Sequence, residues 1–330
     1  MASSGKNWAI VLAAGEGTRL RELTSQGDVV TPKQYCSLSG GRSLLGDALA
    51  RATRIVSRKR IVVVVAEEHR SLWSSDLAHL PVENIVVQPR NRGTAAGILL
   101  PLFTVLERDP EARVAVLPSD HYVEEEYVIE RSMLIALESL EDLREGITLL
   151  GIVPDAPESE YGWIIPRRSP ELARRVARFV EKPDLRQADE LLAQGGVWNS
   201  FLFAANGTDL LELYARKRPE LLARFRSVFA LGPETRAARV AALYDELESS
   251  DFSRELLQGN EDCLRLEIVP PCGWTDLGTP ERVEACLTSQ WEKLVEVRRP
   301  WSDGPKSFDL SWAVQRLRGA TGGRTTMATA

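Results

Sequence analysis

The chain has 330 residues, of which 44% are hydrophobic and 27% are charged, and its formal net charge is −6. This composition is typical of a folded protein with a sizeable core, long enough for one large α/β domain or two modest ones. The acidic balance argues against a general nucleic-acid binder, which would carry a basic face. The cysteines lack CxxC spacing, and the first apolar run is too short for a membrane span or signal peptide, so we expect a cytoplasmic protein without a membrane partner.

Short apolar runs alternate with helical patterns along the first half of the chain. The runs predict buried strands at residues 8–14, 61–66, 85–88, 114–117 and 147–153. The segments between them, 44–56, 68–80, 94–107 and 125–143, have the spacing of amphipathic helices. This alternation indicates a mostly parallel sheet sandwiched between helices.

The pattern changes after residue 160. Shorter strands are predicted at 162–165, 177–180, 201–204 and 264–269, and residues 210–257 have a helical composition. We expect this part to extend the same sheet and to form a lid that carries a second substrate. Residues 319–330 are mainly Gly, Thr and Ala, which predicts a disordered tail.

The first predicted strand ends in a glycine loop. Residues 13–18 (AAGEGT) place small side chains where backbone N–H groups could hold a phosphate, although the loop alone could be an ordinary turn. It matches neither the dinucleotide fingerprint nor the Walker loop. Arg19 can fork onto phosphate oxygens, and Lys33 follows Pro32 in an extended or turning segment. Both favour phosphate binding, while the alternative for Lys33 is a solvated surface lysine.

Residues 88–96 (QPRNRGTAA) follow a predicted strand and open a helix. Gln88 can offer a donor and an acceptor to a base edge, and Gly93 lets a planar base lie against the backbone. Thr94 could cap the helix. The alternative is a plain strand-to-helix turn with a cap.

Two aspartates are candidate metal ligands. Asp120 lies just past a buried strand, at the edge where open α/β sheets bind ligands, and Asp276 lies just before a predicted helix. Mg²⁺ prefers one or two carboxylates together with phosphate oxygens and water. The alternatives are a turn or cap residue at Asp120 and a buried cap at Asp276. His121 is interpreted as a packing residue.

Three later segments place polar residues at the tips of apolar strands: 160–164 (EYGWI), 179–183 (FVEKP) and 197–200 (VWNS). Glu181 and Asn199 can fix sugar hydroxyl groups, and Gly162 permits close approach. Lys182 can neutralise a phosphate. In isolation, Glu181 and Lys182 could also be an exposed charged pair at a strand end.

These motifs resemble those of the sugar-1-phosphate nucleotidyltransferases and occur in the same order along the chain. Three of them are similar to segments of mannose-1-phosphate guanylyltransferases: residues 88–96, 118–121 and 179–183. The resemblance runs from residue 8 to about residue 285. It implies a Rossmann-like, three-layer α/β nucleotidyltransferase fold with a mostly parallel mixed sheet and a sugar-binding lid. The catalytic domain would span 1–290. Within it, about 8–155 would bind the nucleotide and about 156–290 would bind the sugar phosphate. Residues 291–318 would be a helical appendage, a candidate contact in a homodimer.

The resemblance also implies a reaction of GTP with mannose 1-phosphate that gives GDP-mannose and diphosphate, with Mg²⁺ as cofactor. Asp120 and Asp276 would share the ion. Arg19, Lys33 and Lys182 would be the catalytic cations. The nucleotide would be bound by Ala13, Ala14, Gly15, Gly17, Thr18, Gln88, Asn91, Gly93 and Thr94. The sugar phosphate would be bound by Gly162, Glu181, Lys182 and Asn199.

Three residues depart from the family pattern. Ala96 replaces the usual proline, which we expect to alter only helix entry. Trp163 replaces a tyrosine, and Phe201 replaces a frequent glycine. We expect both side chains to touch the sugar pocket. They therefore weaken the prediction that the sugar is mannose more than the prediction that it is a hexose.

Three alternatives remain open. The first is a uridylyl- or thymidylyltransferase for another hexose 1-phosphate. The second is the isoprenoid cytidylyltransferase, which shares residues 32–35 but not 91–94 or 179–183. The third is a non-catalytic regulator that binds a sugar nucleotide; it should have lost a catalytic charge, yet all five are present, at Arg19, Lys33, Asp120, Lys182 and Asp276.

Overall fold

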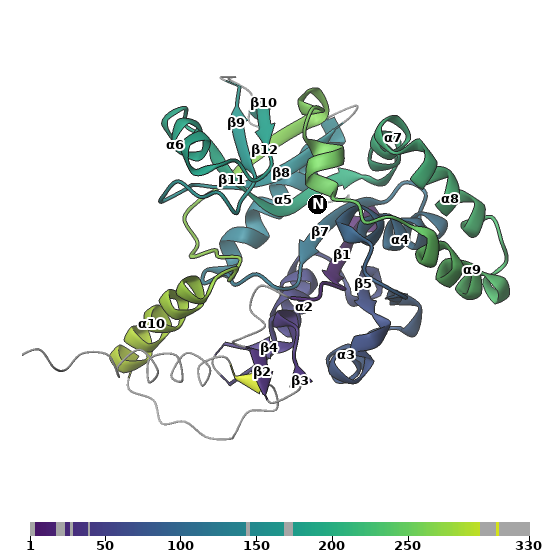
Figure 1. Cartoon of the computed structure of the whole chain (residues 1–330), viewed down its shortest axis with the longest axis horizontal. Helices are drawn as coiled ribbons and strands as arrows, with labels where there is room; N and C mark the ends of the chain where they lie inside the picture. The colour runs from purple at the N-terminus through teal and green to yellow at the C-terminus, as the bar shows by residue number, and fades with distance from the viewer. Residues whose placement is uncertain are drawn as a thin grey trace, which may run out of the picture.

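The computed structural model describes residues 4–17, 24–26, 29–38, 40–142, 146–167, 174–297 and 308–309 (Figure 1). Within these residues nine strands form one sheet. Their spatial order is β6 (Ile85–Gln88), β5 (Ile61–Ala66), β1 (Asn7–Ala13), β7 (Arg113–Pro118), β11 (Val197–Asn206), β8 (Ile147–Ile152), β12 (Leu264–Val269), β10 (Arg174–Val180) and β9 (Trp163–Pro166).

The strands point mainly in one direction. β6, β5, β1 and β7 are parallel neighbours, and β12 is parallel to β8. β11 runs antiparallel to β7, β8 and β9, and β10 runs antiparallel to β12 and β9. Of the nine strands in the described sheet, only β10 and β11 therefore run against the rest. The prediction of a mixed sheet is confirmed.

β11 changes partners along its length. Its register against β8 shifts between Asn199 and Phe203. Before the shift, Trp198 lies opposite Trp163 of β9, and after it Phe203 lies opposite Val116 of β7. β9 also pairs with β10, so β11, β8, β12, β10 and β9 form a closed circuit at one end of the sheet.

The helices begin at identifiable signals. The Ser43 side chain caps α2 by accepting from Gly46 N at 3.0 Å, and Asp184 caps α6 by accepting from Gln187 N at 2.7 Å. The described helices are α2 (Leu44–Ile55), α3 (Arg70–Leu77), α4 (Gly93–Arg108), α5 (Glu126–Asp142), α6 (Leu185–Ala193), α7 (Gly207–Lys217), α8 (Pro219–Phe229), α9 (Pro233–Glu246) and α10 (Pro280–Val297).

Several elements are only two to five residues long. The short strands are β2 (Ser25–Gln26), β3 (Val29–Val30), β4 (Cys36–Ser37) and β13 (Phe308–Asp309), and β13 pairs with β4. The 3₁₀ turns are η1 (Ser4–Lys6), η3 (Lys33–Tyr35), η4 (Arg58–Arg60), η5 (Glu67–His69), η6 (Val82–Asn84) and η8 (Glu261–Cys263), and η7 (Ser253–Leu257) is a π-helix.

Apolar strands bury both faces of the sheet. All six residues of β5 are buried, as expected for a strand covered on both sides. Alternate residues of β1 enter two separate clusters: Trp8 and Ile10 pack with α4, α7, α8 and α9, whereas Ala9 and Val11 pack with α2, α3, α5 and α6. Figure 1 shows α7, α8 and α9 together at one side of the molecule. Helices thus cover both faces, and the fold is α/β.

The prediction that residues 210–257 are helical is confirmed for most of this stretch, which is divided into separate helices. Three helices occupy its first part, and Pro219 and Pro233 each stand in the first turn of a new helix. Proline fits that position but lacks the N–H that would continue the preceding helix, so the chain breaks before each one. Residues 247–251 are not helical, and the π-helix η7 follows them.

The predicted domain limits cut through a helix. α10 continues without a break across residue 290, and of the remainder of 291–318 the structure describes only the strand at 308–309. The helical prediction is therefore wrong at those two residues, where the backbone pairs with β4. Residues 319–330 lie outside the described ranges, and the division at 155 stays a prediction.

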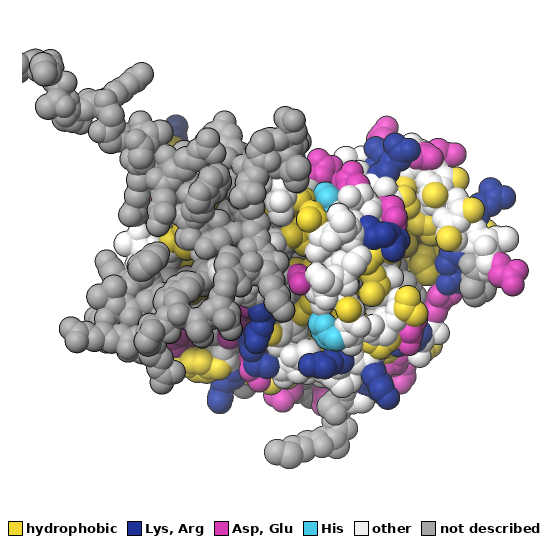
Figure 2. Space-filling model, turned by 90° about the horizontal axis from the view of Figure 1, so that it is seen from below, with side chains coloured by type: hydrophobic (Ala, Val, Ile, Leu, Met, Phe, Trp, Pro, Cys, Tyr) yellow, Lys and Arg dark blue, Asp and Glu magenta, His cyan; other side chains and the backbone are white. Residues whose placement is uncertain are grey.

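No helix among the described residues is long and apolar enough to cross a membrane. On the face shown in Figure 2, the described Lys and Arg side chains alternate with Asp and Glu, so neither sign of charge dominates there.

Candidate active site

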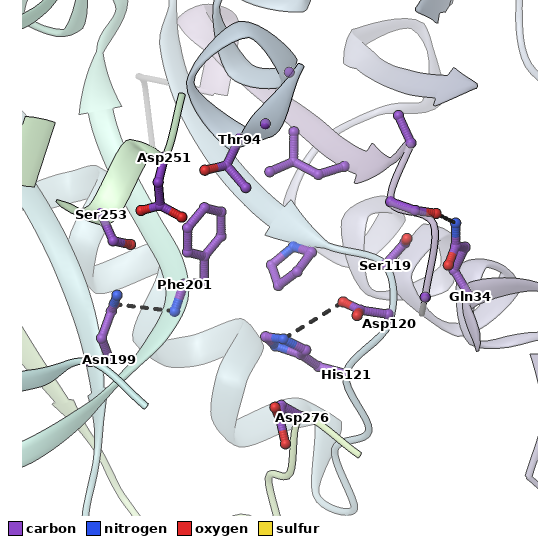
Figure 3. A pocket seen from close by; sticks show the side chains of 18 of the residues that line it. Gln34, Thr94, Ser119, Asp120, His121, Asn199, Phe201, Asp251, Ser253 and Asp276 are labelled. Carbon is purple, nitrogen blue, oxygen red and sulfur yellow. Dashed lines mark hydrogen bonds and ion pairs between the residues drawn. The ribbon is translucent and has the colours of Figure 1, made fainter. Parts of the chain in front are cut away.

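A cavity of about 410 Å³ lies at the carboxyl ends of β1, β5, β6 and β7, the edge at which parallel sheets bind ligands (Figure 3). It is lined by residues from both halves of the chain. Most predicted site residues line it: Ala14, Gly15, Gly17, Gln88, Asn91, Gly93, Thr94, Asp120, Gly162, Glu181, Lys182, Asn199 and Asp276.

Two predicted residues lie away from the cavity lining, and two are outside the described ranges. Ala13 and Lys33 are not among the lining residues; both are buried, with 1% and 4% of their surface exposed. Thr18 and Arg19 lie outside the described residues. Their predicted contacts with the nucleotide and its phosphates therefore stay predictions.

The glycine loop is held in place by the turn η3. Gly17 has φ +62°, and a Cβ there would lie 2.9 Å from Lys33 N, so only glycine fits without strain. The Gln34 side-chain Nε2 donates to Gly15 O at 2.7 Å and to Ala13 O at 3.3 Å. Tyr35 Oη donates to Ala13 O at 3.1 Å. Side chains thus satisfy the loop's carbonyl groups at the edge of the cavity.

The loop at 88–94 is fixed by residues that sequence analysis missed. Ser250 N donates to Arg92 O at 3.1 Å, and Ala95 N donates to Ser250 O at 3.0 Å. Gly93 has φ +78°, and a Cβ there would lie 2.3 Å from Ser250 O. The loop and the chain around Ser250 therefore pack backbone against backbone, and both line the cavity.

Thr94 does not cap α4, contrary to the prediction. The helix begins one residue earlier, at Gly93, and no side chain caps it. Thr94 Oγ1 instead accepts a hydrogen bond from Phe252 N at 2.8 Å. Gln88 Nε2 donates to Arg90 O at 2.7 Å, whereas its Oε1 is buried and has no hydrogen-bond partner in the described chain. An acceptor therefore remains available at this wall of the cavity.

Lys33 contacts both aspartates. Its Nζ lies 3.0 Å from Asp120 Oδ2 and also donates to the backbone oxygen of Asp276. The Lys33 side chain is 5% exposed, whereas that of Asp120 is 36% exposed. The buried ammonium thus supports Asp120 from behind while the carboxylate lines the cavity.

Asp276 is tightly held. Its Oδ1 accepts from Tyr161 Oη at 2.8 Å, from Arg282 Nη1 at 2.7 Å and from Gly278 N at 2.8 Å. Burial would raise the pKa of Asp276, but His121, which is charged only in the acidic range where Asp276 titrates, the Lys33 ammonium and the hydrogen bond from Tyr161 outweigh burial and lower the pKa. Asp276 is therefore a buried turn residue and an ionised group in the cavity wall at the same time.

His121 lies beside both aspartates (Figure 3). Its Nε2 is 3.6 Å from Asp120 Oδ1, and its ring meets the Trp274 ring edge-on at 5.2 Å. Burial lowers the pKa of His121 to about 4, so the imidazole is neutral at pH 7. This packing agrees with the interpretation made from the sequence.

Glu181, Asn199 and Gly162 meet at the opposite wall. A Cβ on Gly162 would lie 2.6 Å from Glu181 Oε2 and 3.2 Å from Asn199 Cβ, so glycine makes room for the carboxylate. Glu181 Oε2 is buried without a partner in the described chain. Burial, with a contribution from Asp251, raises the pKa of Glu181 to about 7.

Trp163 does not touch the cavity, which corrects the prediction. It is fully buried between other core residues, and its Nε1 donates to Glu158 O at 2.7 Å. Phe201, the other departure from the family pattern, does line the cavity.

Three groups of site residues were not predicted from the sequence: Gln34 and Tyr35, Tyr161 and Arg282, and the segment 249–253. Gln34, Tyr35 and Tyr161 lay within motifs that had been noted, but their contacts join distant segments. The segment 249–253 (SSDFS) was hidden by the helical prediction, although its run of small polar residues is typical of a helix end.

The donor set fits a magnesium ion that is held partly by phosphates. Asp120 and Asp276 offer two carboxylates on one cavity. In the described part of the chain, no three His, Cys, Asp or Glu side chains gather as a metal site. A Mg²⁺ ion bound here would thus complete its shell with phosphate oxygens and water, as is usual for this ion.

Comparison with known proteins gives the family. The nucleotidyl transferase family matches residues 8–288. The mannose-1-phosphate guanylyltransferase of Escherichia coli (strain K12) is 30% identical over 319 residues, which cover 92% of this chain and 62% of that protein. The alginate biosynthesis protein AlgA of Pseudomonas syringae pv. tomato is 30% identical over 298 residues, which cover 86% of this chain and 57% of that protein.

A solved structure agrees. The crystal structure described as mannose-1-phosphate geranyltransferase from Thermus thermophilus is 28% identical, with a TM-score of 0.75, and the match covers 85% of this chain and 79% of that one. This chain spans about three fifths of the length of the two curated relatives. The family match nevertheless spans residues 8–288, which is most of the chain that the structure describes. The protein therefore belongs to the nucleotidyl transferase family.

Proposed function

We propose that the protein transfers a nucleotidyl group from a nucleoside triphosphate to a sugar 1-phosphate, with GTP and mannose 1-phosphate as the first choice of substrates. The products are then GDP-mannose and diphosphate. One observation carries this proposal: the glycine loop and the loop at 88–94 face Gly162, Glu181 and Asn199 across one cavity, with Asp120 and Asp276 in its wall. The names of the related proteins support the choice of substrates.

The nucleotide side is suited to a base that offers hydrogen-bond donors. Gln88 Oε1 is a buried acceptor without a partner in the described chain, and it lies beside Gly97, which has no side chain. Guanine presents N–H groups to such an acceptor. A base without a donor at that point would leave the amide oxygen unsatisfied, which costs binding energy.

The opposite side is suited to hydroxyl groups. Glu181 Oε2 is a second buried acceptor, and Asn199 lies next to it. Lys182 lines the cavity and is exposed, so its ammonium can approach the sugar phosphate.

The chemistry requires positioning more than proton transfer. In the proposed reaction a phosphate oxygen of the sugar 1-phosphate attacks the α-phosphorus in line, and diphosphate leaves; the nucleophile is already anionic and needs no base. Asp120 and Asp276 would hold a Mg²⁺ ion, whose chemistry would be to offset the negative charge of the phosphates. Lys182 would steady the attacking phosphate, and Arg19 and Lys33 are proposed to stabilise the leaving diphosphate, Lys33 from its place behind Asp120.

Several finer predictions belong to this proposal. They are a sugar-binding lid in the second half, a three-layer arrangement, a cytoplasmic location and a homodimer. The strands β9 and β10 with α6 are the natural candidates for the lid, since Gly162 and Glu181 lie at their ends.

The test is an assay of diphosphate release with Mg²⁺, over the four common nucleoside triphosphates and several hexose 1-phosphates. We expect the highest kcat/KM for GTP with mannose 1-phosphate. Another pair giving the highest value would reassign the substrates. No release with any pair would refute the transferase proposal.

A further inference from the structure

Phe201 has a backbone conformation that glycine adopts readily and other residues avoid. Its φ is +61°, and it lies where the register of β11 against β8 shifts, between Asn199 and Phe203. Residues with a Cβ are strained in this region and keep it only where their surroundings impose it. The retention of a large aromatic side chain at such a position calls for a physical reason.

Two other aromatic rings support the Phe201 ring from behind. The Phe252 and Phe203 ring centroids lie 6.2 Å and 6.5 Å away, both edge to face, and both residues are buried in the core. Phe201 also lines the cavity, where Figure 3 shows its ring next to Asp251 and toward Thr94, with its backbone nitrogen on the side of Asn199. The left-handed backbone thus places a flat apolar ring, packed against two other aromatic rings, at the wall of the cavity.

Polar groups surround this apolar surface. Asn199 Oδ1 accepts from Phe201 N at 3.2 Å, which fixes the amide and the ring relative to each other. Asn199 in turn lies against Gly162, next to the unpartnered Oε2 of Glu181. One aromatic face beside two hydroxyl-binding groups matches the two-sided character of a hexose, whose ring has C–H faces and a polar rim.

We propose that Phe201 determines specificity for the sugar, by packing its ring against a C–H face of the hexose 1-phosphate. This inference rests on the proposed transferase function. A hexose whose hydroxyl points at the ring loses water at that hydroxyl and gains no hydrogen bond, whereas its epimer presents only C–H groups there. The ring thereby distinguishes hexose 1-phosphates that differ at a single carbon.

The experiment compares Phe201→Leu and Phe201→Gly with the wild type. Leucine keeps an apolar side chain but removes the flat face, and glycine suits the backbone conformation, so at least one variant should fold. Binding of mannose 1-phosphate, glucose 1-phosphate and GTP is measured by calorimetry, and kcat and KM by diphosphate release. We expect the preferred hexose 1-phosphate to bind about tenfold more weakly and the two epimers to come within about threefold, with GTP changed less than about twofold.

A matched control is Phe229→Leu. Phe229 is also a partly buried ring, stacked on Phe103 at 4.8 Å, but it lies on α8 and does not line the cavity. We expect this variant to keep all three affinities.

The outcomes separate this inference from the function on which it rests. A wild type that binds neither hexose 1-phosphate refutes the proposed function and the inference together. A wild type that binds both epimers equally, or Phe201 variants with unchanged sugar binding, refutes the inference alone. Variants that lose GTP binding as much as sugar binding also refute it, because the ring would then support the cavity as a whole.

Discussion

The two walls of the cavity are built in different ways. On the nucleotide side, parallel strands end at one edge, and the left-handed backbone positions are glycines, Gly17 and Gly93. On the sugar side the strands are mainly antiparallel. At that wall Lys182 and Phe201, which have side chains, take left-handed conformations. The left-handed residues of the nucleotide wall are glycines, which adopt this conformation without strain. Those of the sugar wall carry a Cβ and are strained, and such strain is common at functional sites.

The largest expected effect tests whether the two walls act together. Asp120→Asn should lower turnover about a hundredfold or more, because a charge-stabilising group at the reacting phosphates is lost. Diphosphate release is the measurement.

The control for this variant is Asp189→Asn, at an exposed position of α6. Turnover within about twofold of the wild type in Asp120→Asn would contradict the assignment of Asp120, because lost transition-state charge stabilisation lowers kcat far more.

A smaller effect is expected on the nucleotide wall alone. Gly93→Ala places a methyl group 2.3 Å from Ser250 O at φ +78°, so the loop must move. We expect unfolding in urea to show a loss of about 2 kcal/mol, with weaker GTP binding. Gly41→Ala is the control, since no atom of the described residues lies within 4 Å of its added Cβ. Equal stability of the two variants would show that the close packing at Gly93 is not needed.

The smallest expected effect concerns the sugar wall and depends on pH. The pKa of Glu181 rises from its usual 4.5 to about 7 on folding, so the folded state holds a proton that the unfolded state releases in this range. As the pH rises from 4.5 to about 7, Glu181 would become charged while buried, which lowers the free energy of unfolding. The whole loss is present above this range. Glu181→Gln should gain about 1 kcal/mol over the wild type near pH 8 and nothing near pH 4.

Thermal unfolding at several pH values measures this difference. Glu212→Gln, at an exposed position of α7, is the control and should show no such trend. If the stability advantage of Glu181→Gln over the wild type did not grow with pH, Glu181 would not become a buried charge in the folded protein.

The contrast between the walls also explains what the sequence could predict. β5 and β6 have the predicted bounds because runs of β-branched residues have few alternatives, and β12 has them because its apolar and charged residues alternate as in a strand. The glycines of the nucleotide wall could be recognised by residue type. Phe201 and Lys182 could not, because nothing in a phenylalanine or lysine reveals a positive φ. The contacts of Gln34 with the glycine loop and of Ser250 with Gly93 depend on tertiary packing, which no local pattern encodes.

The segment that contains η7 touches both walls. At one end Ser250 is hydrogen-bonded to Arg92 and Ala95 beside the nucleotide loop, and at the other Gln258 Oε1 accepts from Glu181 N at 2.9 Å. Residues 250–258 therefore form a direct connection between the nucleotide loop and Glu181. If one ligand stiffens this connection, thermodynamic linkage requires each ligand to change the affinity of the other by the same factor.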